Sequence, residues 1–100
     1  MLNLTENTTT LDLAAEVAAT FDTIDYDYVW RDTDNERVWL TRPDGHIMEI
    51  QLAPNDVEGG VDLLYTTSTS REALDEGDYD TQDGCPLNEV ENTITTWANS

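Results

Sequence analysis

Negative charge is the feature of this sequence that most constrains its folding. The chain carries 22 Asp and Glu residues against 4 Arg and no Lys, so its formal net charge is −18. Repulsion on that scale keeps a protein soluble and opposes the compact state. Folding therefore requires something that offsets the repulsion: a cationic partner, bound metal ions or a solvent of high salt concentration.

The rest of the composition predicts one modest core. A length of 100 residues favours a single domain over residues 1–100. Apolar residues make up 38% of the chain, and three Trp, four Tyr and one Phe are its bulkiest core candidates. Residues 1–9 are polar and rich in Thr, and we expect them to form a loose lead-in.

Helical spacing of apolar residues marks both ends of the chain. A helix is predicted over residues 10–21, with Thr9 or Thr10 as its cap. A second helix is predicted to begin at Pro86, because proline suits a first helical turn. The apolar stripes are Leu11, Ala14, Ala15, Ala18 and Phe21 in the first helix, and Leu87, Val90, Ile94 and Trp97 in the second.

The stretch between the helices predicts an antiparallel sheet. Alternating apolar residues and turn signals such as Pro43-Asp44-Gly45 indicate four strands, over residues 26–31, 37–42, 46–52 and 61–67. Short connections favour pairing of consecutive strands. The predicted fold class is α+β, a four-stranded antiparallel meander with an N-terminal and a C-terminal helix on one face. Tyr26, Tyr28 and Trp30 share a strand face and are expected in the core.

Residues 68–85 are the least hydrophobic stretch and are predicted to form an acidic loop. Carboxylates on a rigid scaffold can occupy the places where DNA phosphates would sit, and their charge speeds association with a basic surface. The alternative is a mobile, solvated loop. A second group of acids, which includes Asp22, Asp25 and Asp27, flanks the first strand and its turn. The candidate partner-binding acids are Glu72, Asp75, Glu76, Asp78, Asp80 and Asp83, helped by Asp32, Asp34 and Glu36.

Trp39 is a further partner-binding candidate. It points away from the face of Val38 and Leu40 and shares the outer face with Ile47 and Glu49. An exposed Trp–Ile pair could anchor a partner, because aromatic residues are enriched at interface centres. Alternatively, a loop covers this second face.

The segment from Asp78 to Glu89 resembles a calcium-binding loop in part. Glu89 stands at the twelfth position, where calcium loops place a bidentate Glu. However, Gly84 falls at position seven instead of six, and Pro86 interrupts the loop. We therefore predict no specific metal site and no cofactor, and leave open whether this segment binds a cation loosely.

Catalysis and direct nucleic-acid binding are both disfavoured. The single His46 and the single Cys85 could form a dyad only if the fold brings them together, and no carboxylate pair stands out as an acid and a base. We therefore expect no catalytic residues and no enzyme. Four Arg cannot form a basic footprint for nucleic acid against 22 acids.

The sequence favours a cytoplasmic protein without membrane association. One cysteine leaves no intramolecular disulfide and suits a reducing compartment. The N-terminal residues lack the positive region of a signal peptide, and no window approaches the roughly 18 apolar residues of a membrane span. An anionic membrane surface would also repel the chain.

In size, extreme acidity and helix–meander–helix order, the whole chain resembles phage-encoded DNA-mimic inhibitors, especially small anti-CRISPR proteins. The resemblance implies a stoichiometric, non-enzymatic protein that occludes the DNA-binding or PAM-reading groove of a CRISPR effector. Its place of action would be the cytoplasm of the host cell. The acids from Glu72 to Asp83 would carry the mimicry, with Arg71 as a departure inside the region.

Two other interpretations remain open. Small acidic α/β domains also serve as immunity proteins that neutralise basic nuclease or deaminase toxins through the same electrostatics. Alternatively, the chain is a cytosolic domain of a halophile. Absence of Lys, abundance of Asp and many Thr and Ala residues are typical of proteins in a cytosol rich in potassium chloride.

Overall fold

The computed structural model describes residues 4–5, 7–30, 37–54 and 60–99, and only the backbone at residues 28–30 and 82–83. Helices and strands follow one another as a helix, four strands, a short helix, a fifth strand and a C-terminal helix. Their bounds are α1 Thr10–Thr20, β1 Asp25–Trp30, β2 Arg37–Thr41, β3 Ile47–Pro54, β4 Val61–Ser68, α2 Arg71–Asp75, β5 Asp80–Pro86, the 3-10 turn η1 Leu87–Glu89 and α3 Val90–Ala98.

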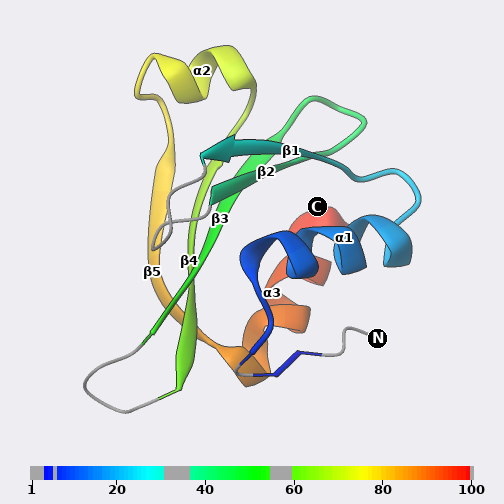
Figure 1. The fold of residues 1–100 in the computed structure, drawn as a ribbon. Coiled ribbons are helices and arrows are strands. Elements are labelled where there is room, and N and C mark those ends of the chain that lie inside the picture. The colour runs from blue at the N-terminus through cyan, green and yellow to red at the C-terminus, as the bar shows by residue number, and fades with distance from the viewer. Residues whose placement is uncertain (1–3, 6, 31–36, 55–59, 100) are drawn as a thin grey trace.

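The strands form one antiparallel sheet in the order β1-β2-β3-β4-β5. Every strand pairs with its neighbour in sequence, as short connections favour. Helices α1 and α3 lie on the same side of the sheet, and α2 lies at the end where β4 passes to β5 (Figure 1). The predicted α+β class, with an antiparallel sheet and helices at both ends of the chain, is confirmed.

The core lies between α1, α3 and one side of the sheet, called here the helix face. Register places alternate residues of paired strands on this face: Val38 opposite Ile50, and Leu40 opposite Met48. Apolar burial of these side chains is the main favourable term in folding. The buried cluster comprises Leu13, Ala14, Val17, Ile24, Val38, Leu40, Met48, Ile50, Leu63, Cys85, Val90 and Ile94.

Capping sets the start of α1. The Thr9 side chain accepts a hydrogen bond from the backbone N–H of Asp12, whose carboxylate accepts one from the Thr9 N–H in turn. This reciprocal pair satisfies two N–H groups that an uncapped helix leaves open. Within the predicted lead-in, Leu4 is partly buried against the core, so at least this residue of the segment 1–9 is anchored.

The main difference from the sequence prediction concerns residues 68–85. This stretch is not one loop, because it contains α2 and the fifth strand, β5. Ser70 caps α2 by accepting from the N–H of Ala73, and the Ser68 hydroxyl donates to the Asp78 carbonyl at 2.7 Å. Strand β5 is held by its ladder to β4 and contributes Cys85, opposite Leu63, to the core. Backbone pairing thus forms this strand where the side chains carry no apolar alternation.

The aromatic residues of β1 were expected in the core, and for Tyr26 this is wrong. Its side chain is 40% exposed, although it lies opposite Leu40 on the helix face. The reason is its place on β1, which is an edge strand of the sheet. The side chains of Tyr28 and Trp30 lie outside the described residues. None of the described helices is long and apolar enough to cross a membrane.

Replacement of Ile94 by Ala tests the helix-face core. The side chain is fully buried, so Ile94→Ala is expected to lower the free energy of unfolding by about 2–5 kcal/mol, through lost burial and the cavity left behind. Urea unfolding at constant salt measures this. The exposed Asn92 on the same helix is the control, since Asn92→Ala should change stability by no more than about 0.5 kcal/mol. Equal small effects would contradict the assigned core.

Candidate functional site

The acidic segment is defined here as Glu72, Asp75, Glu76, Asp78 and Asp80, on α2, the following turn and the start of β5. All five residues are exposed. Among the residues that the structure describes, none of these five carboxylates has an ion-pair partner. The structure therefore brings together five of the nine predicted acids. The side chain of Asp83 and the residues Asp32, Asp34 and Glu36 lie outside the described part of the chain.

The arrangement of these carboxylates opposes local stability. Glu72 and Glu76 are four residues apart, a spacing at which like charges destabilise a helix. Asp75 and Glu76 also stand at the C-terminal end of α2, where cations are preferred. The helix is instead held by its Ser70 cap and by its contacts with β4. The charges are therefore presented by a short helix that they do not help to form.

The acidic segment reaches the edge of the sheet at Asp80, the first residue of β5. Asp80 pairs with Thr67, which lies on the helix face, whereas Thr81 pairs with Thr66 on the opposite side. We call that opposite side the outer face. It carries one row across all five strands, made by Asp27, Trp39, Glu49, Thr66 and Thr81.

Trp39 on the outer face contacts charged groups from two elements, Glu49 on β3 and Arg71 on α2. Its Nε1–H donates to Glu49 Oε2 at 2.8 Å, and the guanidinium of Arg71 lies 4.7 Å from the centre of its ring. Arg71 also forms an ion pair with Asp27, and Arg37 pairs with Glu49 at 3.5 Å. The arginine that looked like a departure within the acidic stretch therefore fastens α2 to β1 and β2.

The predicted exposed pair of Trp39 and Ile47 is wrong for Ile47. That side chain is 1% exposed, although it faces the outer side of the sheet. It lies opposite Ser68, the last residue of β4, from which the chain continues into α2. Trp39 is partly buried. The alternative, in which a connecting segment covers part of this face, describes the structure better.

A groove of about 510 Å³ opens on the outer face beside α2. Trp39, Leu64 and Thr66 belong to its floor on the sheet, and Leu74, Asp75 and Tyr79 come from α2 and the segment after it. Leu64 is 39% exposed and Tyr79 is 48% exposed. Neither residue is among the candidates that the sequence predicts. The signal for Leu64 was its position next to the buried Leu63, which turns an apolar side chain outward.

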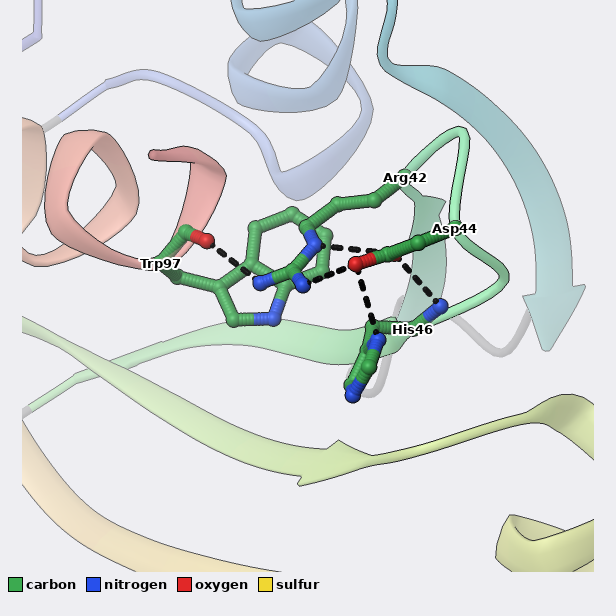
Figure 2. Close-up of polar contacts among 4 residues, drawn as sticks. All are labelled: Arg42, Asp44, His46 and Trp97. Atoms are coloured by element: carbon green, nitrogen blue, oxygen red, sulfur yellow. Dashed lines mark hydrogen bonds and ion pairs between the residues drawn. The ribbon is translucent and has the colours of Figure 1, made fainter. Parts of the chain in front are cut away.

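Arg42 forms a second internal charge network (Figure 2). The residue is only 8% exposed, and its Nη1 donates to the Trp97 carbonyl at 2.7 Å while its guanidinium lies 5.4 Å from the Trp97 ring centre. The same guanidinium makes two hydrogen bonds to Asp44, and the backbone N–H of His46 donates to that carboxylate at 3.1 Å. The network ties the β2–β3 turn to the end of α3.

This network perturbs the titration of Asp44. Hydrogen bonds from Arg42, and then from His46, hold the pKa of the Asp44 carboxyl far below its ordinary 3.8, against an opposing contribution from desolvation. His46 Nδ1 lies 3.1 Å from Asp44 Oδ2. The charged form of Asp44 is therefore the one that the folded protein stabilises.

The fold keeps His46 and Cys85 apart. His46 directly precedes β3, whereas Cys85 pairs with Leu63, which in turn pairs with Leu52 near the other end of β3. Six residues of extended strand correspond to roughly 20 Å. The Cys85 thiol instead contacts the Thr93 hydroxyl at 3.2 Å. A Cys–His dyad is therefore excluded by geometry.

The partial resemblance of residues 78–89 to a calcium loop has no counterpart in the backbone. Asp80–Pro86 form the extended strand β5 and Leu87–Glu89 a 3-10 turn, so the chain does not wrap around a central point. In the described ranges, no three His, Cys, Asp or Glu side chains are grouped so as to hold a metal ion.

Comparison of the chain with protein-family models, with curated proteins and with solved structures finds no match.

The Arg42–Asp44 network should make stability depend on pH in a defined direction. Because the pKa of Asp44 is lowered on folding, its contribution is complete above the ordinary value of 3.8 and is lost as the pH falls through the folded-state value. Asp44→Asn should therefore destabilise the protein at about pH 7 and measurably less at about pH 3, where the same carboxyl in the unfolded chain is largely protonated. Urea unfolding at both values measures the difference. Asp22→Asn controls for net charge, and an Asp44→Asn effect that is the same at both pH values would contradict the assignment.

Proposed function

We propose that this chain is a non-enzymatic binding protein whose acidic segment docks on the basic surface of a partner, in the manner of a nucleic-acid mimic. One observation carries the proposal: five exposed carboxylates within nine residues of chain have no described ion pair, whereas the arginines at 37, 42 and 71 are each paired with a carboxylate of the same molecule. These three arginines thus stabilise the fold, and the acidic segment is left available for an external cation.

The local energetics support an external partner. Like charges at helical spacing on α2, and acids at its C-terminal end, lower the stability of that helix. A basic surface placed against them would remove this repulsion. The scaffold also limits their movement, because α2 is capped, Arg71 fastens it to β1, and the Ser68 hydroxyl holds the turn at Asp78.

The partner that fits this surface is a protein that itself binds nucleic acid. Such proteins present Arg and Lys to phosphates, and these side chains would pair equally with a rigid series of carboxylates. A CRISPR effector, with its DNA-binding or PAM-reading groove, is one member of this class, and the chain would then act as an anti-CRISPR in the host cytoplasm. A basic nuclease or deaminase toxin is another, for which the chain would be the immunity protein.

A second candidate is adaptation to high salt, and a specific observation favours it. Exposed acids also occur far from the acidic segment in sequence, on α1, before and within β1, and on the 3-10 turn: Asp12, Asp22, Asp25 and Glu89. A charge spread over several elements suits a protein hydrated in concentrated potassium chloride. In that case the negative charge is an adaptation to the solvent and does not indicate a partner.

Charge reversal with a matched control separates binding by the acidic segment from binding by net charge. The triple change Asp75→Lys, Glu76→Lys and Asp78→Lys should weaken partner binding by about tenfold or more, because close charge pairs across an interface couple at about 1.5–7 kcal/mol. The control is Asp22→Lys, Asp25→Lys and Glu89→Lys, which changes the net charge equally at exposed positions.

The measurement is capture of lysate proteins on each immobilised variant, followed by competition with duplex DNA. The proposal expects capture that is lost only in the acidic-segment variant and that DNA displaces. Equal loss in both variants would assign binding to net charge alone. Capture that survives the acidic-segment reversal would refute the proposal.

Salt dependence of the fold distinguishes the two candidates. If the acidic segment serves a partner, circular dichroism should show the chain folded without that partner at about 0.1 M potassium chloride, because the buried core and the paired arginines then offset the repulsion, which at this salt acts over about 10 Å. A fold that appears only at molar salt, with both triple variants relieved of that requirement to the same extent, would favour adaptation to salt instead.

A further inference from the structure

The groove on the outer face is lined by both apolar and charged side chains, a combination that suits a ligand with groups of both kinds. Its floor on the sheet includes the side chains of Trp39 and Leu64, and Leu74 and Tyr79 also line it. Two of these side chains, Leu64 and Tyr79, are among the large hydrophobic residues that the structure leaves exposed. A volume of about 510 Å³ lies in the range of binding pockets, about 300–1,000 Å³. The acidic segment reaches into the same groove through Asp75.

The chain's own Arg71 shows which cation this surface recognises. Its guanidinium lies over the Trp39 ring at 4.7 Å and pairs with the Asp27 carboxylate. A guanidinium can stack on an aromatic face and pair with a carboxylate through its planar fork, whereas a lysine ammonium offers only a point charge. The groove offers the same two kinds of group, because the exposed ring of Tyr79 and the carboxylate of Asp75 are both among its lining residues.

The sheet sets the length of the ligand. From Trp39 on β2 to Thr81 on β5, the outer-face row crosses three strand spacings. Three spacings of about 4.8 Å give about 14 Å, which an extended peptide covers in four or five residues. The exposed edges of Leu64 and Tyr79 leave space for apolar side chains on the groove side of such a peptide.

We propose that this groove binds an extended, arginine-bearing segment of a partner protein, four or five residues long, with apolar side chains on Leu64 and Leu74 and an arginine at Asp75 and Tyr79. The inference rests on the proposed function, since it identifies the part of the basic partner that the chain grips. Negative charge dominates this surface: Arg37, the one cation among the described residues that line the groove, is paired with Glu49. The acidic segment would attract the partner, and the groove would select the arginine-bearing sequence.

The test uses the full chain and a defined probe, the peptide acetyl-Leu-Arg-Leu-Arg-Leu-amide, at constant salt. Amide NMR titration should show shifts at Leu64, Thr66, Leu74 and the Trp39 indole N–H. The version of the peptide with Lys in place of Arg should bind several-fold more weakly, because it cannot stack and pair in the same way. Equal affinity for the two peptides, or chemical-shift changes confined to the acidic segment, would contradict the proposal that the groove binds an arginine-bearing segment.

Matched variants separate the groove from the fold and from the acidic segment. Leu64→Ser with Tyr79→Ser should weaken the arginine peptide by about tenfold, as truncation of interface anchors does. The control is Tyr26→Ser, a comparably exposed aromatic residue on the helix face. Unchanged affinity in the double variant would overturn the groove even if the triple reversal at Asp75, Glu76 and Asp78 still abolished partner capture. Capture that survived both sets of changes would remove the proposed function as well.

Discussion

Repulsion among carboxylates is the constraint on which the rest of this structure depends. With a net charge of −18 on 100 residues, each cation has a large effect on which acidic segments can pack close to one another. The core on the helix face gathers the apolar residues of α1, α3 and the sheet. Two of the described arginines add links between segments to those that the core provides. Arg42 holds the β2–β3 turn to the end of α3, and Arg71 holds α2 to β1.

The same constraint assigns different roles in the proposed function to the acidic segment and to the groove. Because Arg37, Arg42 and Arg71 are paired elsewhere in the molecule, the acidic segment has no ion pair among the described residues and can attract a basic surface over the distance that salt allows. Long-range charge speeds encounter and favours basic surfaces as a class. Selection would fall to the neighbouring groove, where exposed Leu64 and Tyr79 offer contacts that depend on shape.

Much of the fold could be predicted because periodic apolar residues report burial directly. The helix beginning at Thr10 and the strands containing Val38, Met48 and Leu63 follow such patterns. The candidate site was predicted only in part. The acids from Glu72 to Asp80 are exposed as a binding surface requires, but the groove beside them is formed by residues from four strands, α2 and the segment after it. No local pattern connects Trp39 with Leu64 and Tyr79.

The sequence by itself determined the charge, the two terminal helices and the alternation of the central strands, because these depend on composition and on neighbours a few residues away. The tertiary structure alone decided that part of the acidic stretch becomes β5, since its pairing partner is the backbone of β4. It also decided that Ile47 is covered, that Tyr26 lies exposed at an edge, and that Arg71 reaches Asp27. Each of these results from contacts between segments distant in the chain, which side-chain periodicity does not encode.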